Sequence, residues 1–80
     1  MKVRFYGKLA DLFGSEREIA VAAPTTVAEV RQRLARDHPE AAETLRDKRV
    51  RACIGDVCVL DDDVVREDEL LEFLAPVSGG

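Results

Sequence analysis

The chain has 80 residues, of which 46% are hydrophobic and 35% charged, and its formal net charge is −4 at pH 7. This length allows one domain with a thin core, and the composition is that of a folded soluble protein rather than a disordered one. The negative charge and the lack of tryptophan argue against a nucleic-acid surface. Because no apolar run approaches the roughly 18 residues of a membrane span and the first residues lack a signal-peptide core, we expect a cytoplasmic protein.

The first part of the chain predicts two strands with a short helical turn between them. In KVRFYG, Val3 and Phe5 alternate with polar residues, which is the period of a strand with one buried face. KLADLF then predicts a helical turn that ends at Gly14. A second alternating segment, REIAVAA at residues 17–23, predicts the second strand, and Pro24 ends it.

The clearest helix follows in TTVAEVRQRLARDHP. Thr26 and Glu29 have the spacing of a capping box, in which each side chain accepts a hydrogen bond from the other's backbone N–H. Pro39 ends the helix because a proline forces the residue before it out of the helical region. EAAETL predicts one more helical turn, and the arginines of the main helix should point away from the core. The predicted buried face consists of Val27, Val30 and Leu34.

The second half of the chain returns to strands. VRACIGDVCVL predicts a hairpin with Gly55-Asp56 as its turn, DDDVVRED a polar connection and ELLEFLA a last strand. The expected order is therefore β, β, α, β, β, β, which is an α+β fold with a mixed sheet of four to five strands packed on one main helix. We expect a single domain at residues 1–75, followed by a flexible C-terminal tail at residues 76–80.

The register of the hairpin predicts which residues face outward. With Gly55-Asp56 as the turn, Cys53 opposes Cys58 and Arg51 opposes Leu60. Alternation along the strands then separates two faces. The predicted inward face holds Ala52, Ile54, Val57, Val59, Leu71 and Phe73. The predicted outward face holds Arg51, Cys53, Cys58, Leu60, Leu70, Glu72 and Leu74.

The outer face of this sheet has no further segment to cover it, so its apolar residues predict a surface for docking a partner. If the two faces were reversed, the same residues would belong to the core, and the sequence leaves that alternative open. The predicted docking residues are Cys53, Cys58, Leu60, Leu70 and Leu74.

Other motifs have simpler structural explanations than functional ones. Cys53 and Cys58 have the gap that opens the plant-type iron–sulfur pattern, but a cluster needs four cysteines, so we expect free thiols that fill apolar surface, or a disulfide if they are oxidised. Two thiols and one histidine cannot complete a zinc site. His38 suits a helix C-terminus and has no nucleophile beside it. LDDDVV is typical of a solvated turn, and RDKRVR of a solvated basic stretch that could also meet an acidic partner.

The last residues, PVSGG, are the remaining candidate for chemistry, because no P-loop or catalytic triad can be assembled elsewhere. Pro76 stiffens the exit from the last strand, and the residues after it cannot pair or pack. Two residues without a Cβ can pass through a narrow channel. The group that they would deliver is the Gly80 carboxylate, which is ionised at neutral pH and is a poor electrophile until it is activated. The tail residues are Pro76, Val77, Ser78, Gly79 and Gly80.

FLAPVSGG resembles the FxPPVSGG ending of the small subunits of molybdopterin synthase, in the MoaD/ThiS family of ubiquitin-like sulfur carriers. The opening strand with KLADLFG, the TTVAEVRQRLARDHP helix and the C-terminal half extend the resemblance over essentially the whole chain. It implies a β-grasp fold. Two positions depart from the family pattern: Ala75 replaces the first of two prolines, and Asp68 replaces a common glycine before the last strand.

The resemblance also implies a function. An E1-like adenylyltransferase would adenylate Gly80 with ATP, and sulfur would then convert the carboxylate to a thiocarboxylate. The tail would enter the large subunit of molybdopterin synthase, in an expected heterotetramer, and donate sulfur to a cyclic pterin precursor. Docking is implied near Cys58 and Leu74. The chain would bind no cofactor, and its part in catalysis would be that of the sulfur-donating subunit of a sulfurtransferase, with the catalytic side chains on the partner.

Three other functions are consistent with the same sequence. It could carry sulfur for thiamine, cysteine or tRNA thiolation, although its length and the PVSGG ending favour molybdopterin. It could be a ubiquitin-like modifier that is joined to proteins through Gly80. It could also be a β-grasp binding module whose glycines have no role. The carboxyl terminus is identical in the carrier and modifier functions, so the sequence does not separate them.

Overall fold

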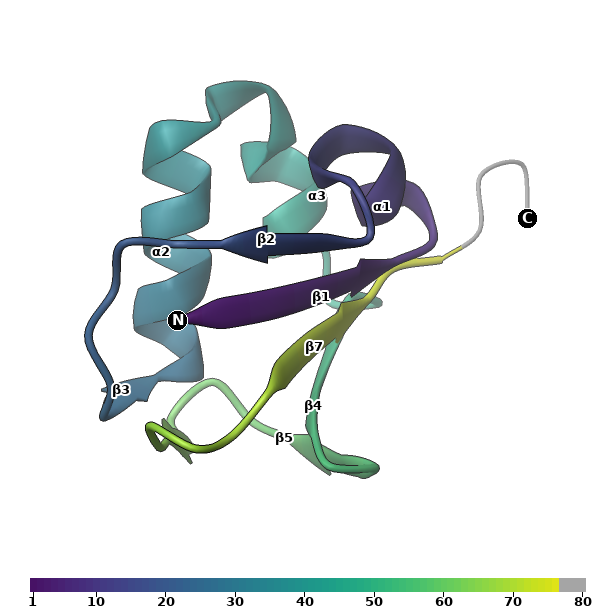
Figure 1. Cartoon of the computed structure of the whole chain (residues 1–80). Coiled ribbons are helices and arrows are strands. Elements are labelled where there is room, and N and C mark those ends of the chain that lie inside the picture. Colours follow the sequence, from purple (N-terminus) through teal and green to yellow (C-terminus); the bar gives the residue numbers. More distant parts are fainter. Residues whose placement is uncertain (77–80) are drawn as a thin grey trace.

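A mixed five-stranded sheet with one long helix packed across one face forms the fold (Figure 1). The computed structural model describes residues 1–76. Its helices are α1 (Lys8–Phe13), α2 (Val27–Asp37), the 3₁₀ turn η1 (Pro39–Ala41) and α3 (Ala42–Arg46). Its strands are β1 (Lys2–Tyr6), β2 (Glu16–Glu18), β3 (Thr25–Thr26), β4 (Arg51–Ile54), β5 (Val57–Val59), β6 (Val64–Val65) and β7 (Leu71–Leu74).

The first and last strands of the described chain lie side by side within the sheet. The order is β2-β1-β7-β4-β5, in which β1 and β7 are parallel and the other neighbours are antiparallel. Although β7 comes last in sequence, it therefore has a hydrogen-bonded strand on each side. This sheet and its single long helix confirm the predicted α+β class.

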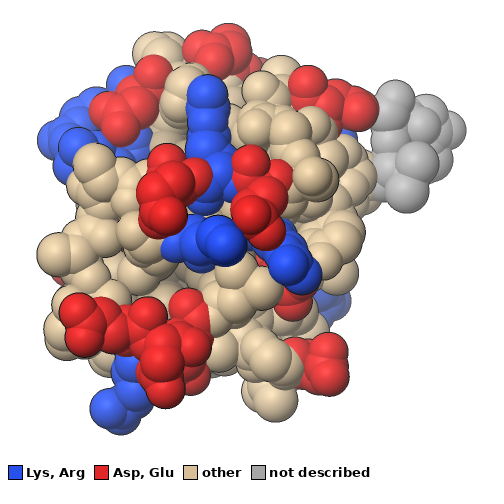
Figure 2. Space-filling model, viewed as in Figure 1, with Lys and Arg blue, Asp and Glu red and all other residues tan. Residues whose placement is uncertain are grey.

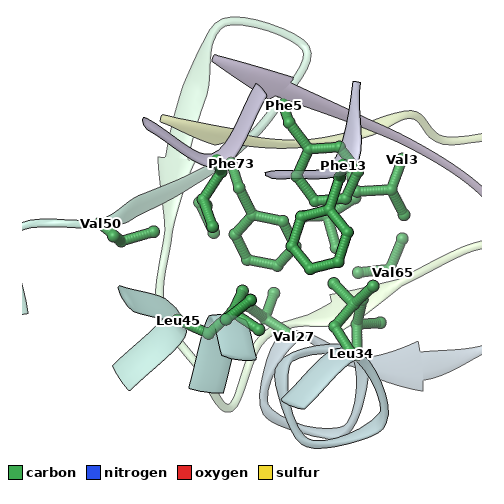
Figure 3. Packing of buried hydrophobic residues seen from close by; sticks show 14 residues of the cluster. Val3, Phe5, Phe13, Val27, Leu34, Leu45, Val50, Val65 and Phe73 are labelled. Carbon is green, nitrogen blue, oxygen red and sulfur yellow. The ribbon is translucent and has the colours of Figure 1, made fainter. Parts of the chain in front are cut away.

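Side chains from both layers meet in one hydrophobic core (Figure 3). The predicted helix face is correct, since α2 buries all three of its predicted residues. Phe5 of β1 stacks on Phe13 of α1 with ring centroids 4.7 Å apart, so an aromatic contact ties the short helix to the sheet. The largest fully buried side chains are Phe5, Phe73, Leu9, Leu34, Leu45, Leu71, Val3, Val27, Val30 and Val65.

The N-terminus of α2 is capped by a variant of the predicted box. Thr26 Oγ1 accepts a hydrogen bond from the Glu29 backbone N–H at 3.2 Å, as the spacing predicts. The Glu29 carboxylate, however, accepts from the Thr25 hydroxyl at 2.7 Å. Thr25 is nearly fully buried, so this bond satisfies a hydroxyl that would otherwise lose its contact with water.

Residues 61–68, predicted as a polar connection, instead help to start α2. They contain β6, which pairs antiparallel with β3 immediately before the helix. Two N–H groups of the first helical turn donate to carbonyls of this segment: Val27 to Asp63 at 3.1 Å and Ala28 to Asp61 at 2.9 Å. A two-residue strand in an acidic segment is too short to give a periodic signal, which is why the sequence did not predict it.

The second strand is earlier and shorter than predicted. β2 ends at Glu18, whereas the prediction placed a strand at residues 17–23. The Ile19 N–H still donates to the Met1 carbonyl at 2.8 Å, but the strand pairing with β1 ends at Lys2 and Glu18. Ile19 packs against the core from outside the strand.

The β4–β5 hairpin has the predicted turn and the predicted pairing of its cysteines. Gly55 and Asp56 have φ values of 51° and 59°, which is the pattern of a type I′ turn. Cys53 pairs with Cys58, but β5 ends at Val59, so Arg51 lies beside Leu74 of β7 and the predicted pair of Arg51 with Leu60 is absent.

Two exposure predictions for this hairpin are wrong. Val57 was expected in the core, yet its side chain is 64% exposed, because it begins an edge strand at the uncovered tip of the hairpin. Cys53 was expected on an exposed patch, yet it is only 8% exposed. It lies on β4, which has β5 on one side and β7 on the other, so neighbouring side chains cover it.

Candidate functional site at the end of the last strand

The chain leaves the sheet at the end of β7, beside the turn that joins β1 to α1. Tyr6 pairs with Leu74 in the parallel register, and one residue later the Ala75 N–H donates to the Tyr6 carbonyl at 3.1 Å. Ala75 and Pro76 are both half-buried. The last described residues are therefore held by the sheet, and the direction in which the chain leaves is set by β1.

Gly7 allows this close approach. It has a φ of +68°, and a Cβ added there would collide with the carbonyl oxygen of Ala75 and lie 3.3 Å from that of Pro76. A side chain is thus excluded both by the backbone conformation and by contact with the exit. Sequence patterns alone did not identify Gly7 as part of the site. A glycine directly between a strand and a helix was the available signal, but nothing in the sequence indicated that residue 75 lies above it.

The outward face beside the exit carries charge as well as apolar surface. Tyr6 and Leu74 are 44% and 40% exposed. The Tyr6 hydroxyl donates to the Glu72 carboxylate at 2.7 Å, and this hydrogen bond raises the pKa of Tyr6. Arg4 pairs with Glu16 at 3.0 Å, which lowers the pKa of that carboxyl group. Figure 2 shows acidic and basic side chains interleaved over this face, with uncharged surface on the side where β7 ends.

The five predicted docking residues do not form one surface. Leu74 and Cys58 are exposed and point to the outward face. The two faces of these strands are therefore oriented as predicted and are not reversed. Cys53 is buried on the outward face. Leu60 is 72% exposed but follows β5 and lines a groove of about 890 Å³ against α2 and α3, and this groove also borders Cys58 at the edge of the sheet. Leu70 is half-buried and lines a different hollow with Met1 and Val21.

The remaining tail residues of the prediction, Val77, Ser78, Gly79 and Gly80, lie outside the described residues. Among residues 1–76, no group of three or more His, Cys, Asp or Glu side chains could hold a metal ion. No helix in this range is long and apolar enough to cross a membrane.

The other polar motifs have local structural partners. His38 caps the C-terminus of α2, lies edge-on to Phe13 with ring centroids 5.0 Å apart and places Nε2 3.0 Å from Arg17. In the aspartate segment, Asp61 pairs with Arg31 at 2.9 Å. In RDKRVR, Arg49 donates to Asp47 at 2.9 Å, and these hydrogen bonds lower the pKa of Asp47 to about 2.

Comparisons with known proteins agree with this architecture. The chain is similar to SAMP1 from Haloferax volcanii, with a TM-score of 0.78 and 21% identity over 100% of this chain and 98% of that one. It is similar to the putative molybdopterin converting factor, subunit 1, from Pyrococcus furiosus, with a TM-score of 0.76 and 19% identity over 95% of each chain. A second structure, of H. volcanii small archaeal modifier protein 1, gives a TM-score of 0.73 and 19% identity over 96% of this chain and 97% of that chain.

At these identities the solved structures establish the fold, which is the ubiquitin-like β-grasp. No curated protein matches the sequence. The profile of the ThiS family, in contrast, matches residues 3–80, which is nearly the whole length. The chain therefore belongs to the ThiS family.

Proposed function

We propose that this protein is a sulfur carrier for molybdopterin synthesis, with sulfur carried as a thiocarboxylate on Gly80. The observation that carries the proposal is the exit of the chain from a central strand: β7 is paired on both sides, and the Tyr6 carbonyl and Gly7 fix the residues that follow it. Membership of the ThiS family supports the chemistry, and the likeness to a protein named as a molybdopterin converting factor supports the pathway.

In the proposed reaction, an E1-like partner transfers AMP from ATP to the Gly80 carboxylate and releases pyrophosphate. A sulfur nucleophile then displaces AMP and leaves a thiocarboxylate. The large subunit of molybdopterin synthase receives the tail, and the thiocarboxylate sulfur bonds to a cyclic pterin precursor. Water then cleaves the acyl C–S bond, which leaves the sulfur on the pterin and regenerates the Gly80 carboxylate. In this scheme the chain supplies a rigid base for the tail, and the slender Gly79 allows the end to enter the partner's active site.

Mass spectrometry of the protein purified from its own cells tests the proposal directly. The tag must leave Gly80 free, so it belongs at the N-terminus, where the Met1 ammonium lies 2.8 Å from Glu18 and donates to the Ile19 carbonyl. A thermal melt of tagged and untagged protein controls for the loss of that charge. The expected result is a Gly80 peptide with one oxygen replaced by sulfur, together with a large synthase subunit. Untagged protein lacking Gly79 and Gly80 should melt at the same temperature and carry no sulfur.

Other results would reassign the function. A thiocarboxylate found with a thiazole synthase, a cysteine synthase or a tRNA-thiolating enzyme would keep the carrier and change its pathway. Isopeptide-linked proteins would make the chain a modifier, the function that the name of small archaeal modifier protein 1 gives to that structural neighbour. A Gly80 that carries neither sulfur nor an adenylate nor a linked protein would contradict both.

The docking surface for the partner is proposed at the outward face next to the exit, around Leu74 and Cys58. Replacing Leu74 by Asp puts a charge on a side chain that is 40% exposed, so the domain should stay folded while the affinity for the large subunit falls about tenfold or more. Leu12→Asp is the matched control, because Leu12 is 44% exposed but lies on α1. Equal affinities of the two variants, measured by titration calorimetry, would place docking elsewhere.

A further inference from the structure

The two cysteines of the chain face each other across the β4–β5 hairpin, with their Sγ atoms 3.4 Å apart. A two-residue turn makes Ile54 and Val57 the hydrogen-bonded pair that closes the hairpin. The next pair, Cys53 and Cys58, is then a non-hydrogen-bonded pair, in which the Cα atoms are about 4.5 Å apart. Disulfides span Cα separations of about 4.4–6.8 Å, so the backbone already has a suitable spacing and only the sulfur atoms must move together.

The two thiols differ in access. Cys58 is exposed on the edge strand, while Cys53 is 8% exposed beneath its neighbours. Burial raises the pKa of the Cys53 thiol, and the hydrogen bond to Cys58 and the Glu72 charge act in the same direction. Cys58 is therefore the thiol that a molecule in solution reaches first. Cys53 is shielded from solution but lies within reach of the Cys58 sulfur.

We propose that Cys53 and Cys58 form a reversible dithiol–disulfide couple whose oxidising substrate is a low-molecular-weight disulfide of the glutathione type. The Cys58 thiolate attacks one sulfur of the small disulfide, forms a mixed disulfide and releases one small thiolate. Cys53 then attacks the Cys58 sulfur and the mixed disulfide bond breaks, and the Cys53 proton passes to the second small thiolate as it leaves. In total two protein thiols are oxidised to one disulfide, and the small disulfide is reduced to two thiols.

The local fold supports this order of events. The type I′ turn at Gly55-Asp56 fixes the register of β4 and β5. Cys53 and Cys58 therefore stay directly opposite each other while the mixed disulfide forms. The proposed disulfide links strands that are already paired and requires no other segment to move. The couple uses no atom of the C-terminal tail, so it goes beyond the proposed sulfur transfer. Cys58 also lies on the proposed docking surface, but the test below uses the chain without a partner and does not depend on the state of Gly80.

The test is oxidation of the full chain in glutathione buffers, followed by acid quenching, alkylation of the remaining thiols and mass spectrometry. The wild type should pass through a glutathione adduct on Cys58 and end as an unalkylated monomer that has lost two hydrogen atoms. Excess dithiothreitol should restore two alkylatable thiols. In Cys53→Ser the adduct on Cys58 should accumulate, because no second thiol displaces glutathione. In Cys58→Ser, adduct formation should be at least about tenfold slower, because the remaining thiol is buried.

A stable glutathione adduct on wild-type Cys58, a dimer linked through Cys58, or two thiols that persist in excess glutathione disulfide would each overturn the proposal. Circular dichroism melts identify any variant that fails to fold. Because Cys53 is buried, Cys53→Ala provides a second variant that keeps the site apolar and lacks the resolving thiol in the same way.

Discussion

At the scale of single residues, Gly7 and Arg31 each hold distant segments together. Gly7 admits the end of β7 against the β1–α1 turn. Arg31 projects from α2 and donates to the carbonyls of Leu45 and Val50 at 2.8 and 3.0 Å. Its guanidinium also lies 5.1 Å from the centre of the Phe73 ring. These two residues fix how the last strand and the helices meet, and the predicted exit of the tail depends on that arrangement.

Replacing Gly7 by Ala should lower the free energy of unfolding by about 2–4 kcal/mol, because the new Cβ adds a collision with the Ala75 carbonyl to an unfavourable φ. Gly14→Ala is the matched control, since Gly14 also has a positive φ, +85°, but has no atom within 4 Å of an added Cβ. Urea unfolding of both variants isolates the collision. If Gly7→Ala is no less stable than Gly14→Ala, the contact with Ala75 does not restrain the exit.

Arg31→Met should cost about 2–4 kcal/mol, because it removes the donors to two backbone carbonyls and the ion pair with Asp61. Arg36 on the same helix is a suitable comparison. Its side chain is 71% exposed and its contact with Asp37 is long, at 4.0 Å, so Arg36→Met should change stability by no more than about 0.5 kcal/mol. Equal losses in denaturant unfolding would show that Arg31 acts through helix propensity rather than through its contacts.

At the scale of elements, the connection between α3 and β4 is built around one carboxylate. Asp47 accepts hydrogen bonds from the backbone and the side chain of Arg49, and its carbonyl accepts from Val50 at 3.0 Å, one residue before β4. The charged form of Asp47 is therefore favoured in the folded state, which its pKa of about 2 expresses.

The contribution of Asp47 to the free energy of unfolding should depend on pH below about 4, where an aspartate in the unfolded chain begins to take up a proton. Above that pH, the ionised Asp47 favours the folded state. As the pH falls through the folded pKa of about 2, this contribution is lost. The stability difference between wild type and Asp47→Asn should therefore be constant at neutral pH and shrink between pH 4 and pH 2. A difference that stays constant in urea titrations across this range would contradict the assignment.

The elements with strong local signals were predicted correctly from the sequence. Thr26 and Pro39 bound α2, and Gly55-Asp56 sets the hairpin register, because turn and cap chemistry is local. What the sequence missed depends on contacts between distant segments. β6 exists because it pairs with β3, and the burial of Cys53 depends on strands on both sides of β4. The five predicted docking residues do not share one surface for the same reason. The alternation of side chains along a strand predicts which face each residue lies on, but not which other segments lie next to it.

At the scale of the whole molecule, the first and last strands form the centre of the sheet. β1 and β7 pair in parallel, and β7 also pairs with β4, so the two halves of the sheet are joined through residues 71–74. The chain thus places its last strand in the interior and releases the residues after it at one end. A carrier needs this combination, because the terminus must be presented to a partner while its attachment stays rigid.

Two truncations should separate the strand from the tail. A chain that ends after Leu70 lacks Leu71 and Phe73, which are fully buried and would each cost about 2–5 kcal/mol if reduced to alanine. Since a domain of this size has about 5–15 kcal/mol of stability in total, this truncation should be unfolded by circular dichroism. A chain that ends after Pro76 keeps every strand and should unfold in urea within about 0.5 kcal/mol of the full chain. A folded protein ending at residue 70, or a marked loss on removing residues 77–80, would show that stability is distributed differently and that the tail is part of the domain.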